Sequence, residues 1–193
     1  KEINKSINAK VDFSDVKLSL FKHFPKVAIV IEDLTIIGLN EFSEDTLLAA
    51  KKVDASAGLF NVLKGKDIKL YGLFFDSPRI HALMNADGKA NWDIAKASSD
   101  TTADADTSAS AFQLTLKKYE INNGYLLFED KQANTYTELT DLTHSGSGDL
   151  TADVFTLSTK TKAATATLIQ DNIPYLADAK ADIETEIKID NRT

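Results

Sequence analysis

Cysteine is absent from the 193 residues, and histidine occurs only three times. Without cysteine the chain has no disulfide, no thiolate nucleophile and no zinc–thiolate site. His23, His81 and His144 stand alone in the sequence, with no partner at the spacing of metal ligands. We therefore expect no metal site and no cofactor. We interpret His81, between Ile80 and Ala82, as a solvent-facing or hydrogen-bonded strand residue.

Basic residues are outnumbered, because 22 Lys and Arg stand against 29 Asp and Glu and the formal net charge is −7. A protein that binds duplex nucleic acid needs clustered Lys and Arg to neutralise phosphates, and here the basic residues are dispersed. The composition therefore argues against a nucleic-acid partner.

The sequence also lacks a run of about 20 apolar residues, the length that spans a bilayer, and it lacks a signal peptide. It opens with Lys1 rather than Met and stops at Thr193, just after a strand-like run at residues 181–190. We interpret it as a piece of a longer protein whose anchor or export signal lies upstream.

Motifs of catalysis are missing as well, since neither nucleophile elbows, phosphate-binding loops nor zinc-protease helices occur. Folding could still bring two carboxylates together, and the candidates for such a pair are Asp76, Asp87 and Asp130. Acidic residues at the ends of strands usually form turns, however, so we expect that the protein is not an enzyme.

What the sequence does contain is a series of short apolar runs separated by turn residues, the pattern of an antiparallel β protein. The predicted strands are residues 27–37, 53–57, 68–75, 79–84, 112–121, 125–128, 135–142, 150–157, 161–169 and 181–189. Helical character is limited to residues 1–8, to residues 43–50 with Ser43 as N-cap, and to one turn at 59–63. The predicted fold is mainly β with a few short helices, arranged as a curved antiparallel sheet or as sandwich-like β modules.

Local signals divide these runs. Ser77–Pro78 predicts a bend, Asp87–Gly88 a tight turn, and Asn123–Gly124 a hairpin turn. We expect residues 79–84 to form a hairpin with a neighbouring segment. A change of side-chain parity predicts a bulge near residues 117–118.

Residues 98–111 contain only Ser, Thr, Ala and Asp, a composition that buries no apolar surface to offset the entropy of ordering. We interpret them as a flexible linker or loop. The predicted organisation is a β-rich module at residues 1–97, this linker at 98–111, and a second antiparallel β module at 112–193 that is truncated at its C-terminal end.

Several segments together resemble the amino-terminal region of AsmA-family proteins. They are AKVDFSDVKLSL at residues 9–20, Phe24–Pro25 with the strand after it, LKGKDI at 63–68, SPRI at 77–80 and DGKANWDI at 87–94, in this order. The last segment is the most specific, and Asp87, Gly88, Asn91 and Trp92 in it are interpreted as structural residues of the family motif. Beyond the linker, GYLLFED at 124–130 and SGDL at 147–150 resemble the following module more loosely.

The resemblance implies a long protein with an amino-terminal transmembrane helix in the inner membrane of a Gram-negative bacterium and the remainder in the periplasm. It also implies extended, curved β-sheets with an apolar groove, and a role in outer-membrane assembly and in phospholipid movement between the membranes. Phospholipid is then the possible ligand, and the periplasmic face of the inner membrane is the expected location.

Alternation on the predicted strands offers a candidate wall for such a groove, formed by Ile68, Leu70, Phe74, Leu114 and Leu116. The same positions fit the core of a sandwich, and Trp92 fits a core position or a sugar-stacking platform. The alternative function is a β-domain that binds glycan or protein at the envelope, as an adhesion module does. An exposed apolar furrow favours the lipid role, whereas a closed core with aromatic residues on outer loops favours the alternative.

Overall fold

The computed structural model describes residues 7–19, 26–58, 70–94, 117–149, 152–190 and 192. In this part of the chain ten strands form one sheet, and the only helical element is a short 3-10 turn. The prediction of a mainly β fold is confirmed. The predicted helical turn at 59–63 and the predicted linker at 98–111 lie outside the described residues, as do the first six residues of the predicted helix at 1–8.

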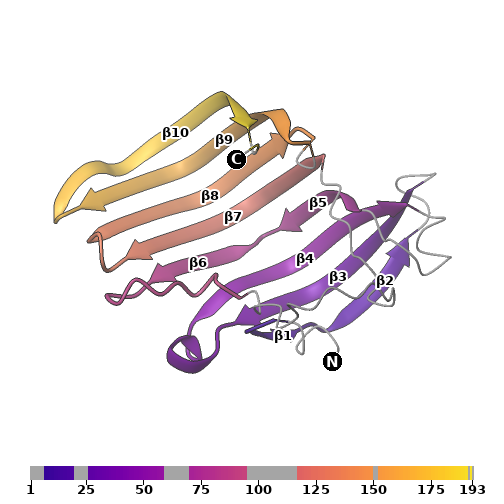
Figure 1. The fold of residues 1–193 in the computed structure, drawn as a ribbon, viewed down its shortest axis with the longest axis horizontal. Helices are drawn as coiled ribbons and strands as arrows, with labels where there is room; N and C mark the ends of the chain where they lie inside the picture. The colour runs from indigo at the N-terminus through magenta and orange to yellow at the C-terminus, as the bar shows by residue number, and fades with distance from the viewer. Residues whose placement is uncertain are drawn as a thin grey trace.

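The first half of the sheet is built on two long strands (Figure 1). β1 (Lys10–Asp12) and β2 (Asp15–Ser19) both pair antiparallel with β3 (Lys26–Ile37), and β3 pairs antiparallel with β4 (Thr46–Gly58). β5 (Leu70–Asp76) and β6 (Arg79–Met84) follow each other across the predicted bend at Ser77–Pro78, and both pair antiparallel with β4.

The second half is an antiparallel meander, as predicted. It consists of β7 (Lys118–Asp130), β8 (Thr135–Ser147), β9 (Val154–Gln170) and β10 (Ile173–Asp190). β7 joins the two halves, because it pairs in parallel with both β5 and β6. The sheet is therefore mixed, and strands from both sides of the predicted linker hydrogen-bond within it. The division into modules at residues 1–97 and 112–193 stays a prediction.

The predicted helix at residues 43–50 is wrong. The 3-10 turn η1 (Asn40–Phe42) is followed at Thr46 by β4. Residues 46–50 pair with β3, and positions 48 and 49 also pair with β6, so their backbone groups find partners on both sides. Tertiary pairing overrides a weak local helical preference, and Ala50 becomes part of the core.

Three further sequence interpretations change. The strand partners of β6 are β4 and β7, and the hairpin predicted for it is limited to an antiparallel bridge between Met84 and Ala90 across the Asp87–Gly88 turn. Asn123–Gly124 is not a turn but lies inside β7, where the register with β8 shifts between Ile121 and Leu126; this bulge replaces the one predicted at residues 117–118. The two strands predicted at 150–157 and 161–169 correspond to the single strand β9. The tight turn at Asp87–Gly88 is confirmed, with a φ of 77° at Gly88.

A row of residues with left-handed backbone crosses the sheet, and we call it the crease: Asp33 in β3, Ser77 between β5 and β6, Asn123 in β7 and Asp141 in β8. Their φ values are 50°, 51°, 53° and 46°. The strand registers bring the first three to neighbouring positions across β3, β4, β5–β6 and β7. At the crease the side-chain alternation moves by one residue, so that Ile31 and Leu34 of β3 pack in the same core cluster.

Candidate functional site

One face of the sheet is uncharged from one edge to the other, and it is apolar from β2 to β5. Directly paired residues lie on the same face of a sheet, and two rows of such pairs run from β2 to β10. The first row is Val16, Ile31, Val53, Phe75, Ile121, His144, Thr161 and Ile183. The second row is Leu18, Ile29, Ala55, Leu73, Tyr119, Gly146, Thr159 and Thr185. Neither row contains a charged residue, and we call the surface that they form the apolar face.

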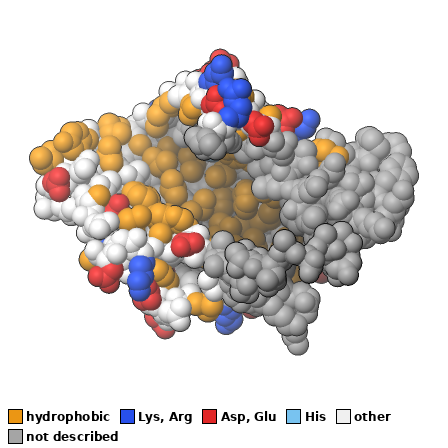
Figure 2. All heavy atoms as spheres, viewed as in Figure 1, with side chains coloured by type: hydrophobic (Ala, Val, Ile, Leu, Met, Phe, Trp, Pro, Cys, Tyr) orange, Lys and Arg blue, Asp and Glu red, His pale blue; other side chains and the backbone are white. Residues whose placement is uncertain are grey.

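The apolar face is packed in its middle and open at its edges. Val53 is only 4% exposed and belongs to the core cluster with Leu34 and Ala50, whereas Ile183 in β10 is 52% exposed. Figure 2 shows hydrophobic side chains gathered into a continuous hollow in the middle of the molecule, with charged side chains at its margins. A contiguous apolar surface rimmed by charged residues is typical of a site of interaction.

No described element forms a second layer over this face. All ten described strands belong to the same sheet, so none of them is available to cover it as the second half of a sandwich. Of the two arrangements predicted for the β modules, the described strands adopt the single curved sheet (Figure 1).

The opposite face is mostly polar and charged. β10 shows the contrast directly, because Glu184 and Glu186 alternate with Ile183 and Ile187 along the strand. On this polar face Lys160 and Glu184 form an ion pair of 2.9 Å. A sheet with this division presents one face to an apolar partner and the other to water.

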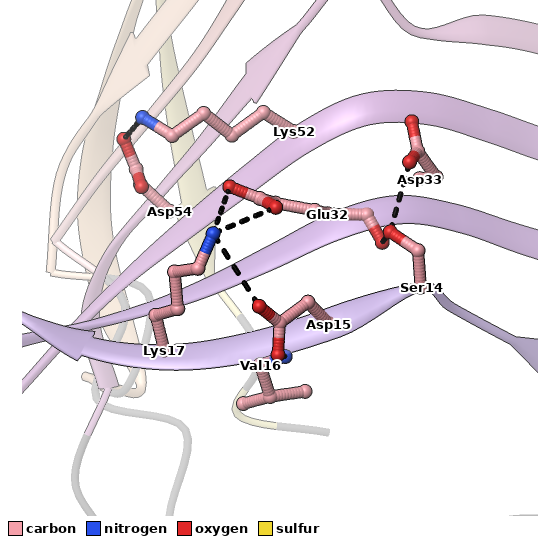
Figure 3. A network of polar contacts seen from close by, with 8 residues as sticks. All are labelled: Ser14, Asp15, Val16, Lys17, Glu32, Asp33, Lys52 and Asp54. Carbon is pink, nitrogen blue, oxygen red and sulfur yellow. Dashed lines mark hydrogen bonds and ion pairs between the residues drawn. The ribbon is translucent and has the colours of Figure 1, made fainter.

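Figure 3 shows the polar face near the β2 edge. The Lys17 ammonium lies 2.9 Å from both carboxylate oxygens of Glu32 and 3.3 Å from Asp15. The hydrogen bond to Glu32, with a smaller contribution from Asp15, raises the pKa of Lys17. The Ser14 hydroxyl donates to Asp33 at 2.8 Å, which ties β2 to the crease. These groups are exposed, so they orient the edge rather than stabilise it strongly.

Of the predicted groove residues, only Phe74 has a described side chain. Ile68, Leu114 and Leu116 lie outside the described residues, and Leu70 is described only as the first backbone position of β5. Phe74 pairs with Asp54 and Glu120, and the Lys118 ammonium lies 6.0 Å from its ring centroid. The structure thus places Phe74 on the polar face, and its neighbours Leu73 and Phe75 on the apolar face. The register with β4 shifts at Tyr71, so the alternation counted from Ile68 does not continue to Phe74.

The family-motif residues form a capped loop at the edge of β6. Gly88 closes the turn by donating its backbone N–H to the Asn85 carbonyl at 3.0 Å, and the Asp87 N–H donates to the Asn85 side chain. Asn91 is 2% exposed and takes the place of a neighbouring strand. Its side-chain oxygen accepts from the Leu83 N–H at 3.0 Å, its amide group donates to the His81 carbonyl at 2.8 Å, and its own N–H donates to the Leu83 carbonyl.

Trp92 lies next in this loop and is 39% exposed. Its ring is 6.0 Å from that of Phe128, between ring centroids. The same loop and the η1 turn line a polar cavity of 640 Å³, which Glu41 and Lys89 cross with an ion pair of 2.8 Å. The loop therefore both finishes the edge of β6 and packs an aromatic ring on β7.

His81 and the acidic residues make contacts with near neighbours in the sheet and its turns. His81 makes a 2.7 Å contact with Glu129 on the neighbouring strand, which confirms the interpretation of a hydrogen-bonded strand residue. Among the described residues there is no cluster of three or more His, Cys, Asp or Glu side chains that could hold a metal ion. Asp130 accepts hydrogen bonds from the N–H groups of Gln132 and Ala133, so it forms a turn, as expected of an acidic residue at a strand end.

His144 was the residue that sequence reasoning missed. It stands in the middle of the apolar face, between Tyr119 of β7 and Thr161 of β9. The only available signal was parity, since Leu142, His144 and Gly146 share one side of the predicted strand region and Leu142 is apolar. A lone histidine on such a strand gives no indication of its partners.

These features define a class: a β-sheet protein whose strands present one continuous apolar face and one polar face. The model of the AsmA family matches residues 1–186, and the chain belongs to that family. Membership is consistent with a role at the cell envelope. Neither the curated proteins nor the solved structures contain a match to the chain. Among the described residues no helix has the length and apolar character needed to cross a membrane.

Proposed function

We propose that this chain is a non-enzymatic envelope protein that holds the acyl chains of phospholipid on its apolar face. In this proposal it works in outer-membrane assembly and in phospholipid movement between the membranes, on the periplasmic side of the inner membrane of a Gram-negative bacterium. The observation that carries the proposal is the pair of uncharged rows from β2 to β10, over which no described element forms a second layer.

The physical reason is the cost of moving an acyl chain through water. Each buried methylene contributes about 0.8 kcal/mol, so a chain of about fifteen methylenes faces a barrier of about 12 kcal/mol. A continuous apolar surface lowers this barrier without bond chemistry. The exposed apolar side chains at the edges of this face, among them Leu18 and Ile183, also favour this role over the glycan- or protein-binding alternative, for which a closed core was expected.

The test is native mass spectrometry with lipid extraction. The protein is purified without detergent from a Gram-negative host and is then challenged with vesicles of mixed phospholipids. We expect stoichiometric phospholipid on the protein. A protein that carries no lipid after purification and none after the challenge contradicts the proposal.

A matched pair of variants tests which face of the sheet binds the lipid. Ile183→Lys with Ile187→Lys adds two positive charges to the exposed end of the apolar face in β10. Glu184→Gln with Glu186→Gln changes the net charge by the same amount on the polar face of the same strand. We expect the lysine variant to lose most of its lipid and the glutamine variant to keep it. Equal loss in both would show that net charge, rather than the apolar face, governs binding.

A further inference from the structure

A short row of polar side chains interrupts the apolar face, and we call Tyr119, His144 and Thr161 the polar row. The Tyr119 hydroxyl lies 3.2 Å from His144 Nε2, and His144 Nδ1 lies 2.8 Å from the Thr161 hydroxyl. The three residues come from three adjacent strands, β7, β8 and β9. The imidazole therefore connects two hydroxyl groups across the sheet.

Gly146 makes this row possible. It is paired directly with Tyr119, and a Cβ atom at this glycine would overlap the tyrosine ring. The ring instead lies across the glycine and brings its hydroxyl toward His144, with the two ring centroids 5.4 Å apart. A larger residue at position 146 would push the tyrosine away from the histidine.

The row is polar but uncharged. In the first row of the apolar face Ile121 and Ile183 flank His144 and Thr161, and in the second row Leu73 and Gly146 flank Tyr119. Neither row contains Asp, Glu, Lys or Arg. Burial lowers the pKa of His144 and raises the pKa of Tyr119, so at neutral pH the imidazole is neutral and the phenol is protonated.

Counting the hydrogen-bond donors and acceptors of the polar row leaves one O–H donor without an acceptor. A neutral imidazole has one N–H and one acceptor nitrogen, so it donates to one neighbouring hydroxyl and accepts from the other. The hydroxyl that accepts keeps its own hydrogen, at Thr161 or at Tyr119 according to the tautomer. Both residues are only partly buried, and no further partner of either hydroxyl uses this O–H among the described residues.

We propose that the polar row binds the carbonyl oxygen of an ester-linked acyl chain and so fixes the position of a lipid along the apolar face. This proposal rests on the proposed function. A neutral O–H in a row without charged residues suits an uncharged acceptor with two apolar arms, which is an acyl ester. A phosphate is better matched by charged donors, and the charged side chains lie on the polar face and at the margins of the hollow.

The experiment compares two phosphatidylglycerols of equal chain length, one with ester-linked and one with ether-linked chains. The ether lipid has the same headgroup and apolar surface but no carbonyl. Equal amounts compete for the protein, and native mass spectrometry gives the ratio of the two bound species. We expect the ester lipid to be preferred about threefold to tenfold, the range of one hydrogen bond to a neutral group.

The diagnostic variant combines Tyr119→Phe, His144→Leu and Thr161→Val, which together remove every donor of the polar row. The imidazole is replaced as well, because its N–H would otherwise be left without a partner and could donate to the carbonyl. The matched control is Thr159→Val, which removes a hydroxyl in the neighbouring row that bonds Thr185 instead of His144. We expect the triple variant to bind both lipids equally and the control to keep the preference. A preference that survives in the triple variant, or is absent from the unaltered protein, overturns the ester site.

A second measurement needs no variant. In a carbonyl-labelled ester lipid bound to the unaltered protein, the infrared carbonyl band should lie at lower frequency than in dry hydrocarbon, because a hydrogen bond weakens the C=O bond. A band at the dry position overturns the inference. If neither lipid binds at all, the proposed function itself fails, so the two failures are distinguishable.

Discussion

Asn91 shows how much one side chain contributes at an unpaired edge. β6 pairs with β4 only at positions 79 and 80, so the backbone groups of His81 and Leu83 would otherwise lack partners on that side. Asn91 supplies both an acceptor and a donor in a buried position, as a neighbouring strand would. The DGKANWDI segment is therefore explained by backbone hydrogen bonding.

Replacing this residue tests the explanation. Asn91→Ala leaves a buried N–H and a buried carbonyl without partners, and we expect the free energy of unfolding to fall by about 2–4 kcal/mol. Urea denaturation measures this loss. Asp93→Ala, at an exposed position of the same loop, should change stability by less than about 0.5 kcal/mol. Equal effects of the two substitutions would contradict the assigned role of Asn91.

His144 predicts a pH dependence whose sign follows from its burial. Its pKa is lowered in the folded protein, so the unfolded chain takes up a proton first as the pH falls through about 6.5. Stability from the neutral imidazole is therefore complete above this pH and is lost below it. The titratable group that contacts the imidazole is Tyr119, which stays protonated throughout this range because its pKa is raised.

We expect the unaltered protein to lose more stability than His144→Gln when urea denaturation is moved from pH 7.5 to pH 5.5. The comparison between the two proteins removes the contribution of carboxylates elsewhere, which is common to both. Parallel pH curves for the two proteins would show that His144 does not titrate differently in the folded state.

At the scale of single elements, the crease explains why several strands were misread. Asn123–Gly124 carries the residue types of a hairpin turn, but the same types also form a bulge, because both require left-handed backbone. Local sequence does not distinguish a chain that reverses from one that shifts by a residue and continues. Only the pairing of β7 with both β6 and β8 decides between them.

The crease also predicts an unusual substitution pattern. Asn123 has a φ of 53°, so Asn123→Val forces a β-branched residue into left-handed backbone, and we expect a loss of about 1–2 kcal/mol. Asn122→Val, at the adjacent exposed position with ordinary strand backbone, should be neutral or slightly stabilising. Thermal unfolding of the two variants measures the contrast, and a milder effect at position 123 would contradict it.

Strong alternation, by contrast, was readable in advance. The sequence alone predicted a strand at residues 181–189 within an antiparallel module, and in the structure Ile183 and Ile187 of this strand alternate with Glu184 and Glu186. The apolar wall was less accessible, because a one-residue register shift at Tyr71 moved Phe74 to the polar face and left Leu73 and Phe75 on the apolar one. Side-chain parity survives along a regular strand but not across a bulge.

At the scale of the whole molecule, the parallel pairing of β5 and β6 with β7 determines cooperativity. These ladders join residues from both sides of the predicted linker into one sheet. We therefore expect a single unfolding transition in urea, with fluorescence of Trp92, the only tryptophan, coinciding with far-UV circular dichroism.

A substitution in the second half extends this test. Gly146→Ala, which forces the Tyr119 ring to move, should lower the midpoint reported by Trp92, whose ring packs on Phe128 of β7, as much as the midpoint of the circular dichroism signal. Two separate midpoints, with only the later strands affected, would instead mean that residues 1–97 and 112–193 unfold as independent modules.

The alternation of faces along β10 has a consequence for how such a sequence tolerates changes in length. Side chains of a strand alternate between its two faces, so inserting one residue before Ile183 would bring acidic side chains onto the apolar face. Insertions and deletions should therefore be tolerated at the turns at residues 131–134 and 171–172, because no alternation of side chains between the two faces has to be maintained there. Within the sheet, the crease is the place where the alternation of side chains already moves by one residue. The sheet tolerates this change because neighbouring strands make it at adjacent positions.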